Sequence, residues 1–91
     1  MYSILASKQF GKDYKKCIKK HLSIELLDNV VLSISENIPL AKKFKVHKLE
    51  GEYKNCWECH LQPDWLLIWK KDDEEKSIQL IRTGSHSDLF T

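Results

Sequence analysis

The stretch YKNCWECHLQPDWLLIW, residues 53–69, decides the fold because its pattern changes at a proline. Before Pro63, side chains alternate between a mainly apolar face and a more polar face that carries Glu58 and His60. After it, residues 65–69 form an almost continuous apolar run, which is typical of a buried strand. The pattern therefore predicts two adjacent strands with His60 on the more polar side of the sheet.

The remaining segments predict two further strands and two helices around this strand pair. Residues 2–6 indicate a short strand, and residues 77–82 another strand after a charged turn at 71–76. Two helices are expected between residues 7 and 39, the first capped by a serine and the second ending before a proline. Their apolar stripes repeat at helical spacing: Phe10, Tyr14, Cys17 and Ile18, then Ile24, Leu27, Val31 and Ile34.

These elements predict an α+β fold. An N-terminal strand and a helical hairpin would pack on a three- to four-stranded antiparallel sheet, whose other face stays partly open. A chain of 91 residues is expected to be one domain, residues 1–91, with a modest core and no cavity large enough for a cofactor. Catalysis would then take place at the surface.

Composition narrows the cellular setting. The longest apolar runs are too short to span a bilayer and no signal peptide is recognisable, so we expect a cytoplasmic protein without a membrane partner. The chain has 3 cysteines, and in a reducing compartment we expect free thiols and no disulfide. A net charge of +2 is weakly basic. Lysines crowd the first helix, which is either a solvated face or a contact for nucleic acid.

The pentapeptide Cys56-Trp57-Glu58-Cys59-His60 matches the CxxCH pattern of covalent haem attachment. Haem is disfavoured because the only methionine is Met1 and because two cysteines three apart on a strand point to opposite faces. Zinc bound by Cys56, Cys59, His60 and His47 is a weak alternative, since a single CxxC lacks a second pair. We expect no metal and no cofactor.

Candidate catalytic residues cluster around the end of the sheet. His60 and Asp64 straddle the proline turn and are expected within hydrogen-bonding distance of each other. Arg82 ends the next strand, His86 follows a Thr-Gly-Ser turn, and His47 lies a short loop upstream. Together these groups suit RNA cleavage: an acid–base pair activates a ribose 2′-hydroxyl and protonates the leaving oxygen, while arginine stabilises the phosphate charge. No metal is needed for this reaction.

The sequence His-x-x-Pro-Asp-Trp-Leu-Leu-Ile from His60, with Arg-Thr-Gly-Ser-His-Ser-x-Leu-Phe from Arg82, resembles the YafQ branch of the RelE-like bacterial toxins. The resemblance is close over residues 45–90 and looser over the helical half. Residues 47–51 resemble the His-x-Leu-x-Gly loop of that family. Trp57 and Trp69 depart from it, standing where relatives often carry arginine and tyrosine, and alternation favours a packing role for Trp57.

The resemblance implies a toxin of a type II toxin–antitoxin pair that enters the ribosomal A site, cuts the mRNA there and stops translation until its antitoxin binds. Carried over by position, the acid–base set is His47, His60, Asp64 and His86, with Arg82 as the phosphate clamp. Trp65 and Phe90 would support or stack, and Lys45 and Lys48 would help to bind substrate. From the residues alone, Phe90 is either a plug at the sheet edge or a surface for base stacking.

Two other functions are compatible with a chain of this kind. One is a non-catalytic toxin on the same fold, like the ParE-like relatives, which poisons a partner such as DNA gyrase by binding alone. The other is a small metal-binding regulatory module that uses Cys56, Cys59 and His60. The clustering of histidines, Asp64 and Arg82 favours the nuclease, because a pure binder has no need for converging proton-transfer groups.

Overall fold

Both long helices begin where a serine side chain caps the first turn. In the computed structural model, which describes residues 1–90, the Ser7 hydroxyl accepts a hydrogen bond from the Phe10 N–H at 2.9 Å, and the Ser23 hydroxyl accepts from the Leu26 N–H at 3.3 Å. The helices and strands are β1 (Ser3–Ala6), α1 (Lys8–Lys19), α2 (Ile24–Ser35), β2 (His47–Lys48), β3 (Trp57–Gln62), β4 (Trp65–Asp72), β5 (Ser77–Gly84) and α3 (His86–Phe90). Short 3₁₀ turns lie at Lys42–Phe44 and Gly51–Tyr53.

The strands form one mixed sheet in the order β1-β5-β4-β3-β2. Strands β2 to β5 are antiparallel neighbours, whereas β1 pairs with β5 in parallel. The α+β class is confirmed, with the N-terminal strand and four antiparallel strands, the upper number predicted. The fourth antiparallel strand, β2, has only two residues, too few to give an alternating pattern.

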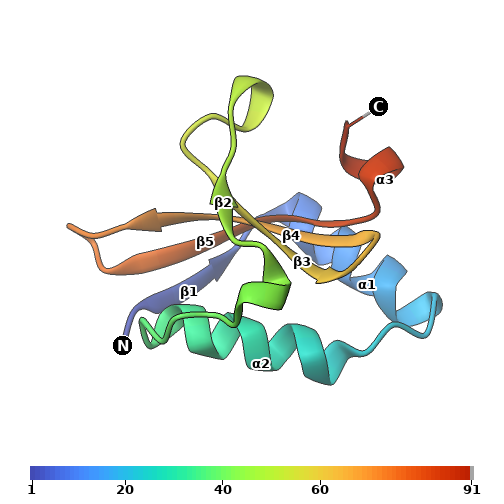
Figure 1. Cartoon of the computed structure of the whole chain (residues 1–91), viewed down its shortest axis with the longest axis horizontal. Coiled ribbons are helices and arrows are strands. Elements are labelled where there is room, and N and C mark those ends of the chain that lie inside the picture. Colours follow the sequence, from blue (N-terminus) through green and yellow to red (C-terminus); the bar gives the residue numbers. More distant parts are fainter. Residues whose placement is uncertain (91) are drawn as a thin grey trace.

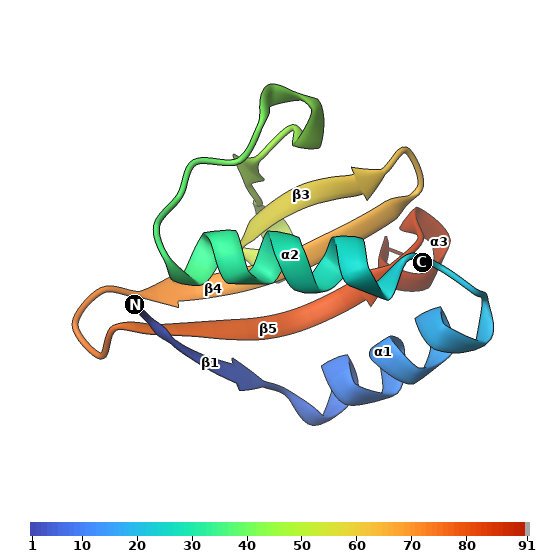
Figure 2. The same cartoon turned by 90° about the horizontal axis from the view of Figure 1, so that it is seen from below.

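Two hydrophobic clusters cover the two faces of the sheet. Figures 1 and 2 show α1 and α2 on one face and the short α3 on the other. The main cluster lies under α1 and α2 and includes Leu27, Cys59 and Trp69. The smaller cluster contains Cys56, Leu66, Ile68 and, from α3, Leu89. The face opposite the long helices is therefore only partly covered, as the sequence predicts, and its polar residues lie beside α3.

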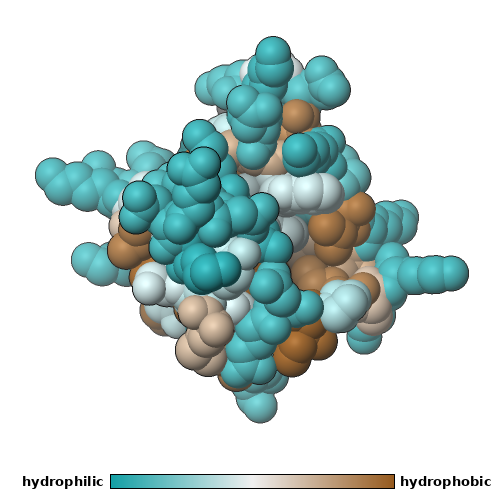
Figure 3. Space-filling model, turned by 90° about the vertical axis from the view of Figure 1, so that its left-hand side faces the viewer, coloured by the Kyte–Doolittle hydropathy of each residue, from teal (hydrophilic) through white to brown (hydrophobic). Residues whose placement is uncertain are grey.

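The charged turn predicted between the last two strands is exposed, and of the predicted apolar stripes of α1 and α2 one residue is exposed. The β4–β5 turn carries Asp73, Glu74, Glu75 and Lys76, all exposed, and the side of the molecule seen in Figure 3 is largely hydrophilic. Ile18, which the helical spacing places in the buried stripe of α1, is 50% exposed.

Within residues 1–90, no helix is both long enough and apolar enough to cross a membrane.

Candidate active site

The three histidines of the C-terminal half form a row on the partly open face of the sheet. The ring centroids of His47 and His60 lie 6.2 Å apart, and those of His60 and His86 lie 5.7 Å apart. His47 comes from β2, His60 from β3 and His86 from the start of α3. The predicted convergence of these side chains, called the histidine row below, is therefore present in the structure.

The buried Glu58 lies against two members of the histidine row, His47 and His60. It pairs with His47 across β2 and β3, and its Oε1 lies 3.2 Å from His47 Nε2 and 3.8 Å from His60 Nε2. The residue is only 4% exposed, and its Oε2 has no hydrogen-bond partner among the described residues. A buried carboxylate oxygen without a donor is costly, so such groups concentrate where a ligand supplies the donor.

His47 has a hydrogen-bond acceptor at each ring nitrogen. Nε2 faces Glu58, and Nδ1 lies 2.8 Å from the carbonyl oxygen of Lys45. The backbone of Lys45 is in the left-handed region, with φ of 50°, which turns this carbonyl toward the ring. The protonated imidazolium can thus donate at both nitrogens.

Asp64 binds His86 and not His60, which corrects the expectation from the sequence. Its Oδ1 accepts from His86 Nδ1 at 2.7 Å and from the His86 backbone N–H at 2.9 Å. Leu66 of β4 pairs with Gly84 of β5. Because the two strands are antiparallel, Asp64, two residues before Leu66, lies opposite His86, two residues after Gly84. The two hydrogen bonds lower the pKa of the Asp64 carboxyl, the backbone N–H contributing most. The carboxylate orients His86 and leaves its Nε2 for a substrate.

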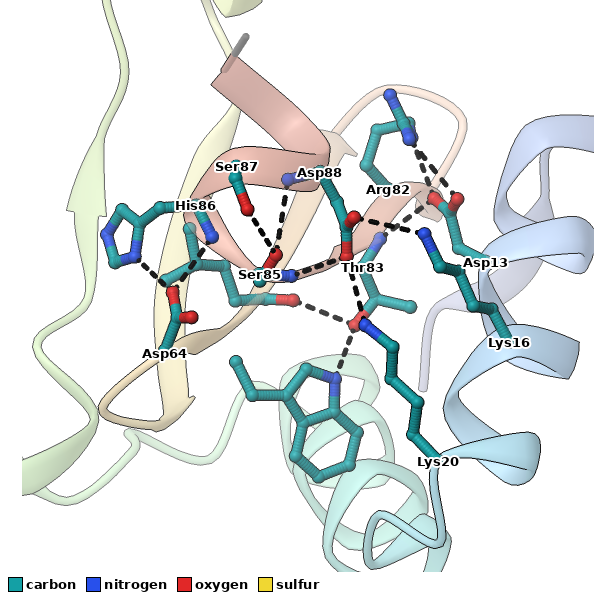
Figure 4. A network of polar contacts seen from close by, with 12 residues as sticks. Asp13, Lys16, Lys20, Asp64, Arg82, Thr83, Ser85, His86, Ser87 and Asp88 are labelled. Atoms are coloured by element: carbon teal, nitrogen blue, oxygen red, sulfur yellow. Dashed lines mark hydrogen bonds and ion pairs between the residues drawn. The ribbon is translucent and has the colours of Figure 1, made fainter.

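A capping network fixes α3, which carries His86 (Figure 4). The Asp88 carboxylate accepts from the Ser85 backbone N–H, and the Ser85 hydroxyl accepts in return from the Asp88 N–H, both at 3.2 Å. Lys16 of α1 and Lys20, which caps the C-terminal end of that helix, reach the same carboxylate at 3.0 and 3.6 Å. The pKa of Asp88 is lowered well below its usual range, chiefly by the hydrogen bond from Lys16.

Gly84 leaves the space that this network needs. Its φ is 155°, and a Cβ there would lie 3.1 Å from Asp88 Oδ2 and 3.2 Å from Asp88 Cβ. The predicted turn at Thr83 and Gly84 is in fact the end of β5, and the chain bends only at Ser85. Glycine is required at this position by the close approach of α3.

Arg82 lies across β4 from His47 and His60, on β5, the strand that leads to His86. It pairs with Ile68, which also pairs with Glu58 on its other side. Its guanidinium donates to buried Asp13 of α1, from Nε at 2.7 Å and from Nη2 at 3.2 Å. This ion pair raises the pKa of Arg82.

One cleft nevertheless joins Arg82 to Asp64. It has a volume of about 490 Å³ and lies between α1, the β3–β4 turn and the start of α3. Its lining carries the basic residues Lys12, Lys16, Lys20 and Arg82 together with the acidic residues Asp13, Asp64 and Asp88. Lys16 and Lys20 pair with Asp88, and Arg82 pairs with Asp13.

The aromatic residues of the site take different positions. Phe90 is 47% exposed, its ring meets Tyr53 edge to face at 5.6 Å, and it lies 6.5 Å from His86. An open ring beside the histidine row suits base stacking better than a plug. Trp65 is only 2% exposed and its indole N–H donates to the Thr83 hydroxyl at 3.0 Å. No ring face of Trp65 is open for a base, so this residue supports the site by packing in the core and holding Thr83.

The lysines before β3 lie near the site without entering it. Lys48 Nζ is 5.4 Å from the centre of the Trp57 ring, and Trp57 itself packs against the main cluster. Lys45 is exposed and contributes its carbonyl to His47. Both residues are exposed, but Lys48 lies over Trp57 on the helix-covered face of the sheet, opposite the histidine row.

The described residues do not fit a metal site. Among residues 1–90, no group of three or more His, Cys, Asp or Glu side chains is arranged to hold an ion. Cys59 packs in the main cluster and Cys56 in the smaller one, so the two thiols lie on opposite faces of the sheet. All three cysteines are free and buried, and burial raises the pKa of the Cys59 thiol to about 12.

Sequence reasoning missed Glu58, Asp13 and Asp88 as residues of the site. The alternation places Glu58 on the face of His60, so that position could have been found. Asp13 is a single acid in a lysine-rich helix, and no local pattern indicates that it meets Arg82, 69 positions away.

Comparison with known proteins gives a consistent result. A family model described as "Bacterial toxin of type II toxin-antitoxin system, YafQ" matches residues 2–91. The chain is 38% identical over 85 residues to the "mRNA interferase toxin YafQ" of Escherichia coli K12, covering 92% of this chain and 90% of that protein.

Two solved structures are similar over nearly the whole chain. The crystal structure of a metal-bound toxin from Helicobacter pylori superposes with a TM-score of 0.93 at 43% identity, covering 99% of this chain and 100% of that one. The crystal structure of the E. coli DinJ–YafQ complex gives 0.89 at 35% identity, covering 100% of both chains.

Proposed function

The chain belongs to the YafQ family of toxins of type II toxin–antitoxin systems, and from this we propose that it cuts mRNA on the ribosome, in the A site. Family membership makes it an mRNA interferase, which is an endoribonuclease. We propose further that residues 1–91 act as one toxin domain in the cytoplasm, with a cognate antitoxin as partner. The E. coli DinJ–YafQ complex is the relative that supports this partner.

The observation that carries the proposal is the histidine row with its two carboxylates. In the proposed reaction a base takes the proton of a ribose 2′-hydroxyl, and the oxygen attacks the adjacent phosphorus. The bond to the 5′-oxygen breaks, that oxygen takes a proton from an acid, and a 2′,3′-cyclic phosphate remains. Neighbouring rings 5.7 to 6.2 Å apart can serve both proton transfers around one phosphodiester.

Each member of the set has a distinct chemical use in this scheme. His86, oriented by Asp64, offers Nε2 to the RNA, and His47 and His60 share the carboxylate of Glu58. The unpartnered Glu58 Oε2 can accept a hydrogen bond from a ribose hydroxyl. Arg82 would hold a phosphate, Phe90 would stack on a base, and Lys45 and Lys48 would contact the backbone.

The exposed lysines of α1 are proposed to face ribosomal RNA. Lys8, Lys12, Lys15 and Lys19 all lie on its exposed side. Such contacts position a protein on a phosphate backbone without reading its sequence. They explain how a weakly basic chain can recognise a large RNA assembly.

The proposed reaction requires no metal ion. Cleavage by protein from which transition metals have been removed, with the magnesium that ribosomes need held constant, should equal that of untreated protein. This test is needed because the similar toxin from H. pylori has a metal-bound crystal structure. Activity that returns only with one equivalent of added zinc or copper would contradict a metal-free mechanism.

Primer extension on mRNA in a reconstituted translation reaction tests the ribosome dependence. Breaks at A-site positions only when ribosomes are present would support the proposal. Breaks with and without ribosomes would indicate a free ribonuclease that uses the same residues. No breaks in either reaction would favour a non-catalytic toxin.

A further inference from the structure

Asp13 is the one charged side chain on the buried face of α1. The buried residues of this helix are Phe10, Asp13 and Cys17, so an acid occupies a position in the apolar stripe. Asp13 is 7% exposed. Burying a charge is unfavourable unless it is paired, and an apolar residue at such a position is often as good for stability. The acid therefore needs an explanation other than packing.

The Asp13 carboxylate is saturated with hydrogen-bond donors. Oδ2 accepts from Arg82 Nε at 2.7 Å and from the Thr83 backbone N–H at 3.2 Å. Oδ1 accepts from Arg82 Nη2 at 3.2 Å and from the Gln9 amide at 3.1 Å. Two donors at each oxygen fix the carboxylate, and the two parallel bonds to Arg82 fix the plane of the guanidinium.

Only one edge of the guanidinium remains open. Asp13 occupies the edge formed by Nε and Nη2, and Nη1 lies 3.4 Å from the Tyr53 hydroxyl. The Tyr53 ring contacts Phe90, which neighbours His86. The side chain of Arg82 is 22% exposed and lines the cleft that Asp64 also lines. The open edge is thus on the side of the aromatic residues and not on that of α1.

We infer that Asp13 is a positioning residue for RNA cleavage: it holds Arg82 so that the Nη1 edge of the guanidinium binds a phosphate of the RNA. The inference rests on the proposed role of Arg82 as the phosphate clamp. Asp13 itself touches no substrate. A flexible arginine on a strand end could turn toward solvent, and this carboxylate prevents that turn.

A double-mutant cycle with Asp13→Asn and Arg82→Ala separates positioning from packing. Single-turnover cleavage by toxin on programmed ribosomes gives the rate constant and the half-saturating toxin concentration. We expect Asp13→Asn to lower the rate constant by about 100-fold, the scale on which misplaced groups act, with a much smaller change in half-saturation. In the Arg82→Ala background the same substitution should change the rate constant by less than about 2-fold, because coupled residues are not additive.

The outcomes distinguish this inference from the proposed function. If Arg82→Ala cleaves at the wild-type rate, Arg82 does not bind the phosphate, and both its proposed role and the inference about Asp13 are wrong. If Arg82→Ala is impaired and Asp13→Asn adds its full effect to it, the clamp stands and Asp13 is merely structural.

Asp13→Glu guards against a loss of folding in Asp13→Asn. It keeps the charge but moves the carboxylate by one methylene, so we expect a folded protein with reduced cleavage that depends on Arg82 in the same way. Wild-type cleavage by a folded Asp13→Glu variant would overturn the inference. Glu25→Gln at an exposed position of α2 is the matched control, because it changes an acid to an amide away from Arg82, and it should leave cleavage unchanged.

Discussion

Asp64 stays ionised over a wide pH range because His86 donates to it twice, from the backbone and from the ring. The pKa of its carboxyl is lowered from the ordinary 3.8. A lowered pKa in the folded state means that the carboxylate contributes stability above its ordinary pKa and loses it as the pH falls through the lowered pKa. At neutral pH the carboxylate is therefore available to orient His86.

Replacing His86 with Ala should raise the pKa of Asp64 only part of the way to its ordinary value. The ring hydrogen bond is lost, but the backbone N–H, the largest cause of the shift, remains. Carbon NMR titration of the Asp64 carboxyl measures the change. His47→Ala is the control and should leave this pKa alone. An unchanged pKa in His86→Ala would show that Asp64 and His86 are not paired in solution.

Glu58 gives a second prediction for a single residue. Glu58→Gln keeps the shape of the side chain but removes the buried charge, so cleavage should fall by about 100-fold, in the range of acid–base catalysis. The melting temperature should stay equal or rise, because a buried carboxylate with an unpartnered oxygen is costly. Exposed Glu52→Gln is the control. Wild-type cleavage by Glu58→Gln would remove this residue from the site.

At the scale of elements, α3 is a short helix that depends on one residue for its position. It spans His86–Phe90, and a helix of this length is not stable alone. Asp88 caps it, packs over Gly84 and binds Lys16 of α1 and Lys20 at the end of that helix. The placement of His86 and Phe90 therefore depends on Asp88.

Asp88→Asn should loosen α3 without unfolding the sheet. The free energy of unfolding should fall by about 1 kcal/mol, since exposed ion pairs and helix caps contribute on that scale. Hydrogen exchange at the Leu89 amide, which donates to the Ser85 carbonyl, should accelerate while exchange in β4 stays unchanged. Equal exchange at Leu89 in variant and wild type would show that the cap does not hold the helix. Exposed Asp28→Asn on α2 is the control.

The elements differ in how far the sequence predicts them. Helix starts at Ser7 and Ser23 and strands β3 to β5 follow from capping and periodicity, which are local signals. The parallel pairing of β1 with β5 joins residues more than 70 positions apart, and β2 is too short to show a period. Glu58 meets His47 through β2, and Asp13 meets Arg82 across 69 positions, so these partners depend on non-local contacts. Alternation could place Glu58 on the right face but could not show that it lies under two histidines.

At the scale of the whole molecule, positive charge and chemistry occupy neighbouring surfaces. Lysines line the exposed side of α1, and the cleft beside this helix extends to Asp64. The acidic β4–β5 turn lies at the other end of β5 from the site. In the proposed function, this separation would direct an RNA toward the histidine row despite a net charge of only +2.

Replacing Lys12 and Lys15 with Gln should weaken ribosome binding mainly at low salt. Removal of one lysine that binds a phosphate should reduce the slope of log affinity against log salt by about one. Binding of the toxin to vacant ribosomes at several salt concentrations measures the slope. Lys76→Gln, on the acidic turn, is the control and should leave it unchanged. An unchanged slope in the Lys12 and Lys15 variant would show that α1 does not face the RNA.

The histidine row is proposed to drive attack by the ribose 2′-hydroxyl, and the other roles in the site depend on this step. The most direct measurement uses ribosomes programmed with an mRNA that has a single 2′-deoxy nucleotide on the 5′ side of the cleaved phosphate. We expect the toxin to bind these ribosomes normally and to cut the all-ribose message but not the substituted one. Cleavage of the substituted message at the same position and rate would mean that water or another nucleophile attacks the phosphate, and would contradict the mechanism.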